Sequence, residues 1–154
     1  MITRRSALAI AGALLVSACG RAVPDPQVAP VNLYPNETPE LRALINKYAA
    51  VHDIPESLLH RVIQRESRYN PGARNGPYYG LMQIHPQTAR GVGFSGSPNA
   101  LLDAETNLIY AGKYLKGAWI VSGGDEEEAV MWYSRGYYYE AKRLGLLEET
   151  GMRT

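Results

Sequence analysis

Residues 58–71 read LLHRVIQRESRYNP, and this stretch decides the fold prediction. Its apolar residues Leu59, Val62 and Ile63 recur at the spacing of one helix face. Glu66 follows on that face, one turn later. A carboxylate facing an apolar interior is costly to ionise, so its pKa rises and it can donate a proton near neutral pH. The alternative is an amphipathic helix whose last turn has emerged into solvent.

Helix signals continue on both sides of this stretch. The sequence Thr38-Pro39-Glu40 reads as a cap, a first helical residue and an acidic first turn, which predicts a helix over residues 39–51. Pro55 opens the next helix, which carries Leu58 to Glu66 and must end before Asn70-Pro71. The Gly- and Pro-rich stretch 71–80 is expected to be a loop.

Further signals predict helices in the second half of the chain. Ser97-Pro98 looks like a helix start, and Asp103 is expected to cap a long helix that ends at Gly123-Gly124. The final helical region is predicted to begin at Asp125, with Gly136 as a candidate break. Because no alternating run is long enough to predict a strand, the expected fold class is mainly α, a single helical domain with little or no sheet.

The first 18 residues read as a signal peptide. Arg4 and Arg5 precede an apolar run of 12 residues, shorter than the about 20 of a transmembrane helix. The run ends in VSAC, which is similar to a bacterial lipobox and predicts lipidation of Cys19, the only cysteine. An ordinary cleavage site is the alternative. The two arginines leave Sec and twin-arginine export both open.

Residues 19–38 contain four prolines, with a fifth directly after them at Pro39, and are expected to form a tether. At about 3 Å per residue, an extended tether of this length spans roughly 50–60 Å. Residues 39–154 are then expected to form a single folded domain. The lipid anchor at Cys19 makes the membrane a partner and predicts a periplasm-facing lipoprotein of the cell envelope. Gly20, in place of an aspartate, favours the outer membrane if the host is Gram-negative.

The charge pattern gives no support for nucleic acid as a partner. Removing Arg4 and Arg5 from the 16 basic residues leaves 14, against 15 acidic residues, and no basic run is present. His52, His60 and His85 show no ligand spacing, and neither a calcium loop nor a phosphate loop is found. We therefore predict no metal and no cofactor.

Four segments resemble those of one known family: Glu66-Ser67-Arg68-Tyr69-Asn70-Pro71; Gly80-Leu81-Met82-Gln83-Ile84; Asn107-Leu108-Ile109-x-x-Gly112-x-Tyr114-Leu115; and Ala129-x-x-x-Tyr133-Ser134-Arg135-Gly136. In this order they resemble the catalytic domain of the soluble-type lytic transglycosylases (SLT domain), relatives of goose-type lysozyme, over roughly residues 40–145. The resemblance implies a lysozyme-like fold. It also implies cleavage of the MurNAc-GlcNAc β-1,4 bond of peptidoglycan without water, leaving a 1,6-anhydromuramoyl end.

The resemblance gives both proton transfers to one glutamate, here Glu66, first as general acid and then as general base. A hydrolytic glycosidase usually needs a second carboxylate at a defined separation. The other acidic residues, such as Asp103 and Glu105, read as charges at helix N-termini, which is mild support for a mechanism with one carboxylate.

The resemblance further implies substrate contacts around Glu66. Ser67 would bond near the glutamate or the substrate acetamido group, or serve as a turn hydroxyl. Gln83 would bond sugar or stem-peptide groups, and His85 is expected to line the cleft rather than act as a base. Tyr133 would hold Glu66 through its hydroxyl, with a buried core tyrosine as the alternative.

Two departures from the family pattern affect the expected cleft. The usual Tyr-Asn-x-Gly reads Tyr133-Ser134-Arg135-Gly136, which removes an amide and adds a cation that either meets muropeptide carboxylates or faces solvent. Pro77-Tyr78-Tyr79 replaces small residues and, with Tyr137-Tyr138-Tyr139, forms either a sugar platform or packing. Ser134 and Tyr79 are therefore candidate substrate-binding residues.

Two alternatives to the transglycosylase stay open. One is a hydrolytic muramidase of the same fold, and the other is a non-catalytic peptidoglycan-binding or envelope-assembly protein. A partnership with envelope or secretion machinery is compatible with each of them.

Overall fold

The computed structural model describes residues 32–152. The predicted signal peptide, the lipidation site Cys19 and the tether up to residue 31 lie outside the described residues. The elements are α1 (Pro39–His52), α2 (Glu56–Glu66), β1 (Arg74–Asn75), β2 (Tyr78–Tyr79), α3 (Pro86–Gly91), the 3-10 helix η1 (Pro98–Leu102), α4 (Ala104–Val121), α5 (Glu126–Arg135) and α6 (Tyr138–Leu144). The prediction of a mainly helical domain with little sheet is confirmed. None of the described helices has the length and apolar character needed to cross a membrane.

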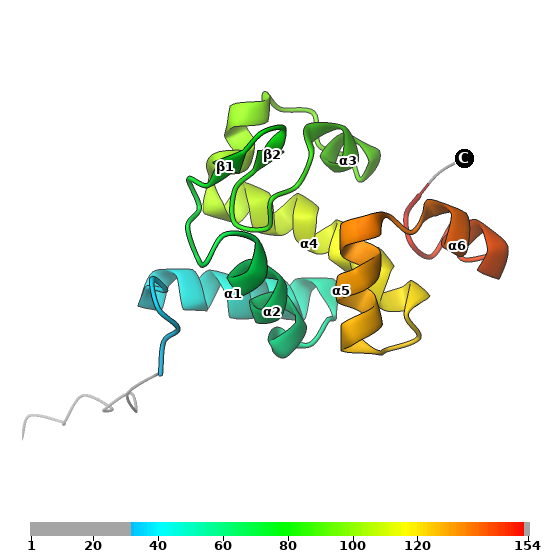
Figure 1. The fold of residues 1–154 in the computed structure, drawn as a ribbon, viewed down its shortest axis with the longest axis horizontal. Helices are drawn as coiled ribbons and strands as arrows, with labels where there is room; N and C mark the ends of the chain where they lie inside the picture. The colour runs from blue at the N-terminus through cyan, green and yellow to red at the C-terminus, as the bar shows by residue number, and fades with distance from the viewer. Residues whose placement is uncertain (1–31, 153–154) are drawn as a thin grey trace, which may run out of the picture. The chain divides into compact units, whose positions relative to one another are not determined.

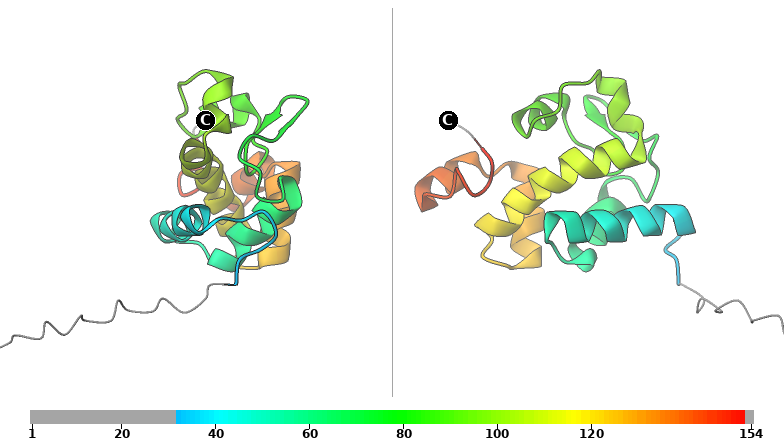
Figure 2. Two further views of the ribbon diagram at one scale, coloured as in Figure 1. Left: turned by 90° about the vertical axis from the view of Figure 1, so that its left-hand side faces the viewer. Right: turned by 180° about the vertical axis from the view of Figure 1, so that it is seen from behind.

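Helix α4 is the central element of the fold. It packs against α1, α3, α5, α6 and η1. Figures 1 and 2 show α1 and α2 on one side of it, and α3 with the β1–β2 ribbon on the other. Helix α5 lies against both α4 and α2. The fully buried side chains Leu58, Leu59, Leu108 and Leu115 fill the space between these helices. Burying each such side chain stabilises the fold by about 1.5–3 kcal/mol.

The predicted caps form the helix starts. The Thr38 hydroxyl accepts from the Leu41 amide at 3.2 Å. Asp103 and Asp125 each accept, through a carboxylate oxygen, from the backbone amide three residues on, at 2.8 Å and 2.9 Å. Gly136, with φ of 83°, ends α5 at the predicted break.

Three local features differ from the sequence prediction. Pro55 is the residue before α2 rather than its first helical residue. The predicted loop 71–80 contains a two-stranded antiparallel ribbon, in which Arg74 pairs with Tyr79 and Asn75 with Tyr78. The helix predicted from Ser97-Pro98 is the short η1, because Asp103 starts α4 immediately afterwards.

The folded unit begins before the predicted boundary at residue 39. The Glu37 side chain is fully buried and accepts from Arg42 Nε and Nη2 at 2.7 Å and 2.6 Å and from the Tyr34 amide at 2.9 Å. The Tyr34 ring stacks on Tyr69, with centroids 5.4 Å apart, and the Tyr69 hydroxyl is bonded to His60 Nδ1 at 3.0 Å. The residues just before α1 are thus fixed to α2 and to the turn that follows Glu66.

We expect Glu37→Gln to lower the free energy of unfolding at pH 7 by about 1–3 kcal/mol, because Arg42 loses its buried anion. Burial raises the pKa of the Glu37 carboxyl, but the bonds from Arg42 and from the Tyr34 amide outweigh burial and hold it below its ordinary 4.5. The stabilisation is therefore complete above pH 4.5 and is lost as the pH falls through the folded-state pKa.

Urea unfolding followed by circular dichroism, at pH 7 and pH 3, measures this difference. Glu40→Gln, which alters an exposed carboxylate in the first turn of α1, is the matched control. An equal loss for Glu37→Gln at both pH values would show that the carboxylate charge is not what stabilises the segment.

Candidate active site

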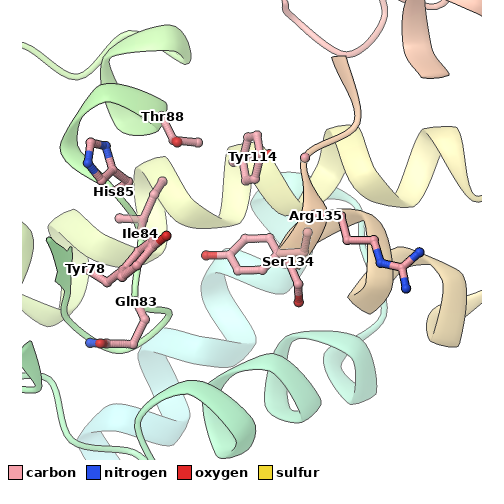
Figure 3. Close-up of a pocket in the computed structure, with 10 residues that line it drawn as sticks. Tyr78, Gln83, Ile84, His85, Thr88, Tyr114, Ser134 and Arg135 are labelled. Atoms are coloured by element: carbon pink, nitrogen blue, oxygen red, sulfur yellow. The ribbon is translucent and has the colours of Figure 1, made fainter. Parts of the chain in front are cut away.

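Glu66 lines a cavity of about 360 Å³ between α2, the ribbon and α5. A neighbouring cavity of about 240 Å³ shares four residues with it: Tyr78, Gln83, Tyr133 and Ser134. In Figure 3, Tyr78, Gln83 and His85 lie on one side of this second cavity, and Ser134 and Arg135 on the other. The two cavities form a continuous cleft, and this cleft is the candidate active site. Among the described residues that line it, Glu66 is the only carboxylic acid.

The environment of Glu66 favours its protonated form. Glu66 is the last residue of α2, and its side chain is 24% exposed, so it is neither sealed in the core nor free in solvent. Burial raises the pKa of the Glu66 carboxyl above its ordinary value. The positive charge of Arg65, whose Nε lies 3.5 Å from Glu66 Oε1, offsets part of this rise. Glu66 can therefore carry a proton to a ligand and afterwards act as a base.

Tyr133 lies near Glu66, but its hydroxyl has another partner. The hydroxyl is buried and donates to the Met82 carbonyl at 2.8 Å. No hydrogen bond joins Tyr133 to Glu66 within the described part of the chain, so the predicted contact is not formed in this structure. Burial, and secondarily the charge of Glu66, hold the pKa of the Tyr133 phenol far above its ordinary value. Tyr133 is thus a neutral group that fixes the floor of the cleft.

Gln83 is held in an uncommon backbone conformation at the cleft. Its φ is 48°, in the left-handed region that few non-glycine residues adopt. Its amide nitrogen donates to the carbonyl oxygens of Ala73 and Gly80, at 3.1 Å and 2.9 Å. The amide nitrogen therefore ties the ribbon to the following turn, and the amide oxygen is the atom left to bind a ligand.

Asn107, which was not predicted as a site residue, fixes the turn that carries Gln83. Its fully buried side chain accepts from the Met82 amide at 2.9 Å. It donates to the carbonyls of Tyr79 and Leu101, at 2.9 Å and 2.8 Å. A polar residue on the buried face of a predicted helix was the signal that could have identified it.

Gly80 gives the turn its close approach to Asn107. Gly80 has φ of 76°, and a Cβ at this position would lie 2.2 Å from the Leu101 carbonyl oxygen and 2.3 Å from the Asn107 amide nitrogen. Any side chain here would displace the Asn107 side chain and break the three hydrogen bonds it makes, which we call the Asn107 clamp. The turn therefore requires glycine on both steric and conformational grounds.

Neither Tyr79 nor Ser67 lines the two cavities. Tyr79 is buried beneath the guanidinium of Arg74, 4.7 Å from its ring centroid, and does not line either cavity, whereas its exposed neighbour Tyr78 lines both. The Ser67 hydroxyl donates to the Ile63 carbonyl at 3.3 Å at the end of α2, which is the turn-hydroxyl alternative.

His85 and Ser134 do line the cleft. His85 Nδ1 accepts from the Gln87 amide at 3.1 Å and caps α3, and its ring meets Tyr78 edge-on, with centroids 5.9 Å apart. The Ser134 hydroxyl donates to the Val130 carbonyl at 3.0 Å. Within residues 32–152, no group of three His, Cys, Asp or Glu side chains is arranged to hold a metal ion.

Comparison with known proteins connects this cleft to a family. A family model described as "Transglycosylase SLT domain" matches residues 43–145, which is more than half of the chain. The match includes Glu66, the turn 80–83, Asn107 and Tyr133, and it confirms the family resemblance. No solved structure matches the chain.

We expect Asn107→Ala to lower the free energy of unfolding by about 2–4 kcal/mol, because the buried Met82 amide and Leu101 carbonyl lose their partners. The Tyr79 carbonyl still accepts from the Ile84 amide at 3.1 Å. Protection of the Met82 amide against hydrogen exchange should fall with it. Asn99→Ala, at an exposed position in η1, is the matched control. A loss no larger than that of the control would show that the turn holds without the clamp.

Proposed function

Since the chain belongs to the SLT transglycosylase family, we propose that it cleaves peptidoglycan glycan strands between MurNAc and GlcNAc without water. The observation that carries the proposal is Glu66, a half-buried carboxyl group with a raised pKa and no second carboxylic acid in the lining of the cleft. A hydrolytic muramidase usually places a second carboxylate where it can activate water. A single acid group instead fits a reaction in which the substrate supplies its own nucleophile.

In the proposed first step, the protonated Glu66 carboxyl gives its proton to the glycosidic oxygen. The bond between this oxygen and C1 of the muramoyl residue breaks, GlcNAc leaves as an alcohol, and positive charge develops at C1. The Glu66 carboxylate, which has lost its proton, stabilises that positive charge electrostatically.

In the second step, the C6 hydroxyl oxygen of the same muramoyl residue bonds to C1 and gives its proton to the Glu66 carboxylate. This closes the 1,6-anhydro ring and restores the protonated glutamate. Water is neither consumed nor released in the two steps. One carboxyl group completes the cycle because each step returns it to the state that the next step needs.

The rest of the cleft positions the sugar. The exposed ring of Tyr78 provides a face on which a sugar ring can stack, and the amide oxygen of Gln83 accepts from a sugar hydroxyl. His85 extends the same wall and contacts the sugar rather than acting as a base. The hydrogen bond from the Tyr133 hydroxyl to the Met82 carbonyl fixes the position of this wall relative to Glu66.

We expect incubation of the full chain with purified peptidoglycan sacculi to release muropeptides with anhydro ends, lighter by one water than their reducing-end forms. Mass spectrometry distinguishes the two. Reducing ends would indicate a hydrolase. Binding to sacculi without release would indicate a non-catalytic wall-binding protein.

Glu66→Gln should reduce release of anhydro products by at least about a thousandfold, because the amide keeps the shape and loses the proton. Glu56→Gln, at the exposed start of the same helix, is the matched control. Retained turnover in Glu66→Gln would assign the proton transfers to another group.

The pH dependence tests the assigned protonation state. Activity should fall on the alkaline side as Glu66 loses its proton, and Arg65→Gln should move this fall to higher pH. The reason is that Arg65 lowers the pKa of Glu66, so removal of its positive charge raises that pKa. The measurement is kcat/KM against pH for both proteins. An alkaline limb that stays in place, or that moves to lower pH, would contradict this electrostatic role.

A further inference from the structure

A third cavity adjoins the cleft on the far side of Ser134. It has a volume of about 340 Å³, lies between α2 and α5, and carries three arginine side chains: Arg61, Arg65 and Arg135. The apolar side chains of Val130 and Met131 form the rest of its wall, with Glu127 at the edge.

The positive charge of the arginine cavity is only weakly compensated. Arg61 Nη2 lies 3.9 Å from Glu127 Oε1, and both side chains are largely exposed, so the attraction is small. Arg65 Nε lies 3.5 Å from Glu66 Oε1, and the Arg65 side chain is more than half exposed, so this attraction is also weakened by solvent. Within the described residues, Arg135 has no carboxylate within 4.0 Å. The cavity therefore attracts anions.

Ser134 connects the arginine cavity to Glu66, because it lines all three cavities. Its short side chain turns back to its own helix through the bond to Val130, so it leaves the junction open. Figure 3 shows Arg135 reaching from α5 away from Tyr78 and Gln83. A ligand in the cleft can therefore extend a branch past Ser134 towards the arginines.

We propose that the arginine cavity binds carboxylates of the stem peptide that the muramoyl residue carries. This rests on the proposed function, which places a muramoyl residue beside Glu66. The stem is an anionic branch on that sugar, and a guanidinium pairs with a carboxylate through two parallel hydrogen bonds. Val130 and Met131 offer the apolar surface that small aliphatic stem residues contact. Ser134 and Arg135 thereby make the enzyme selective for strands that keep their peptides.

The test measures binding rather than turnover. The full chain carrying Glu66→Gln is titrated calorimetrically with two soluble ligands, glycan oligomers bearing stem peptides and the same oligomers after amidase has removed the peptides. We expect tighter binding of the peptide-bearing oligomer, with a preference that weakens as salt is added. Adding Arg135→Gln should reduce that preference about fivefold, the loss of one partly exposed ion pair.

Arg90→Gln, at an exposed arginine of α3 that does not line the described cavities, is the matched control and should leave the preference intact. Equal affinity for the two oligomers overturns the proposal, and so does an Arg135→Gln variant that weakens both equally. The outcome is separable from the proposed function. Anhydro products without a peptide preference would reject only the arginine cavity, and a peptide preference without anhydro products would reject only the reaction.

Discussion

The cleft depends on the buried amide of Asn107. This one side chain pairs with the Met82 amide and with the carbonyls of Tyr79 and Leu101, so it joins the end of the ribbon, the turn 80–83 and η1 to the central helix. The Tyr133 hydroxyl then bonds to the carbonyl of the same Met82. Both bonds are buried, where an unpaired polar group is most costly. The wall opposite Glu66 is therefore fixed by polar contacts to α4 and α5 rather than by its own two-residue strands.

This dependence explains which parts of the site the sequence could predict. Helix caps and apolar periodicity are local, so the position of Glu66 at the end of α2 and the start of α4 at Asp103 followed from short stretches. The direction of Tyr79 was not local, because neighbouring strand residues face opposite sides and the register of the ribbon decides which one meets the cleft. The left-handed backbone conformation of Gln83 accompanies the hydrogen bonds that Asn107 and the Gln83 side chain make to this turn. The residue preferences of the sequence do not predict such a conformation at a glutamine.

The segment before α1 is likewise held by polar contacts to residues that are distant in the sequence. Its proline content predicted a tether, yet Glu37 is buried against Arg42, and Tyr34 stacks on Tyr69, three residues after Glu66. A polar network was hard to foresee because its partners lie on three elements. As a consequence, Tyr34 and the residues that follow it up to α1 are fixed beside the turn that ends α2.

The degree of burial of Glu66 suits its proposed role as first an acid and then a base. A fully buried carboxyl would hold its proton too firmly to protonate a glycosidic oxygen, and an exposed one would have lost it at neutral pH. At 24% exposure, with Arg65 offsetting part of the burial effect on its pKa, Glu66 lies between these limits. The same arginine also lines the arginine cavity. An anionic branch bound there would weaken the effect of Arg65 on Glu66, which raises the pKa of the glutamate and favours its proton-bearing form when such a substrate is in place.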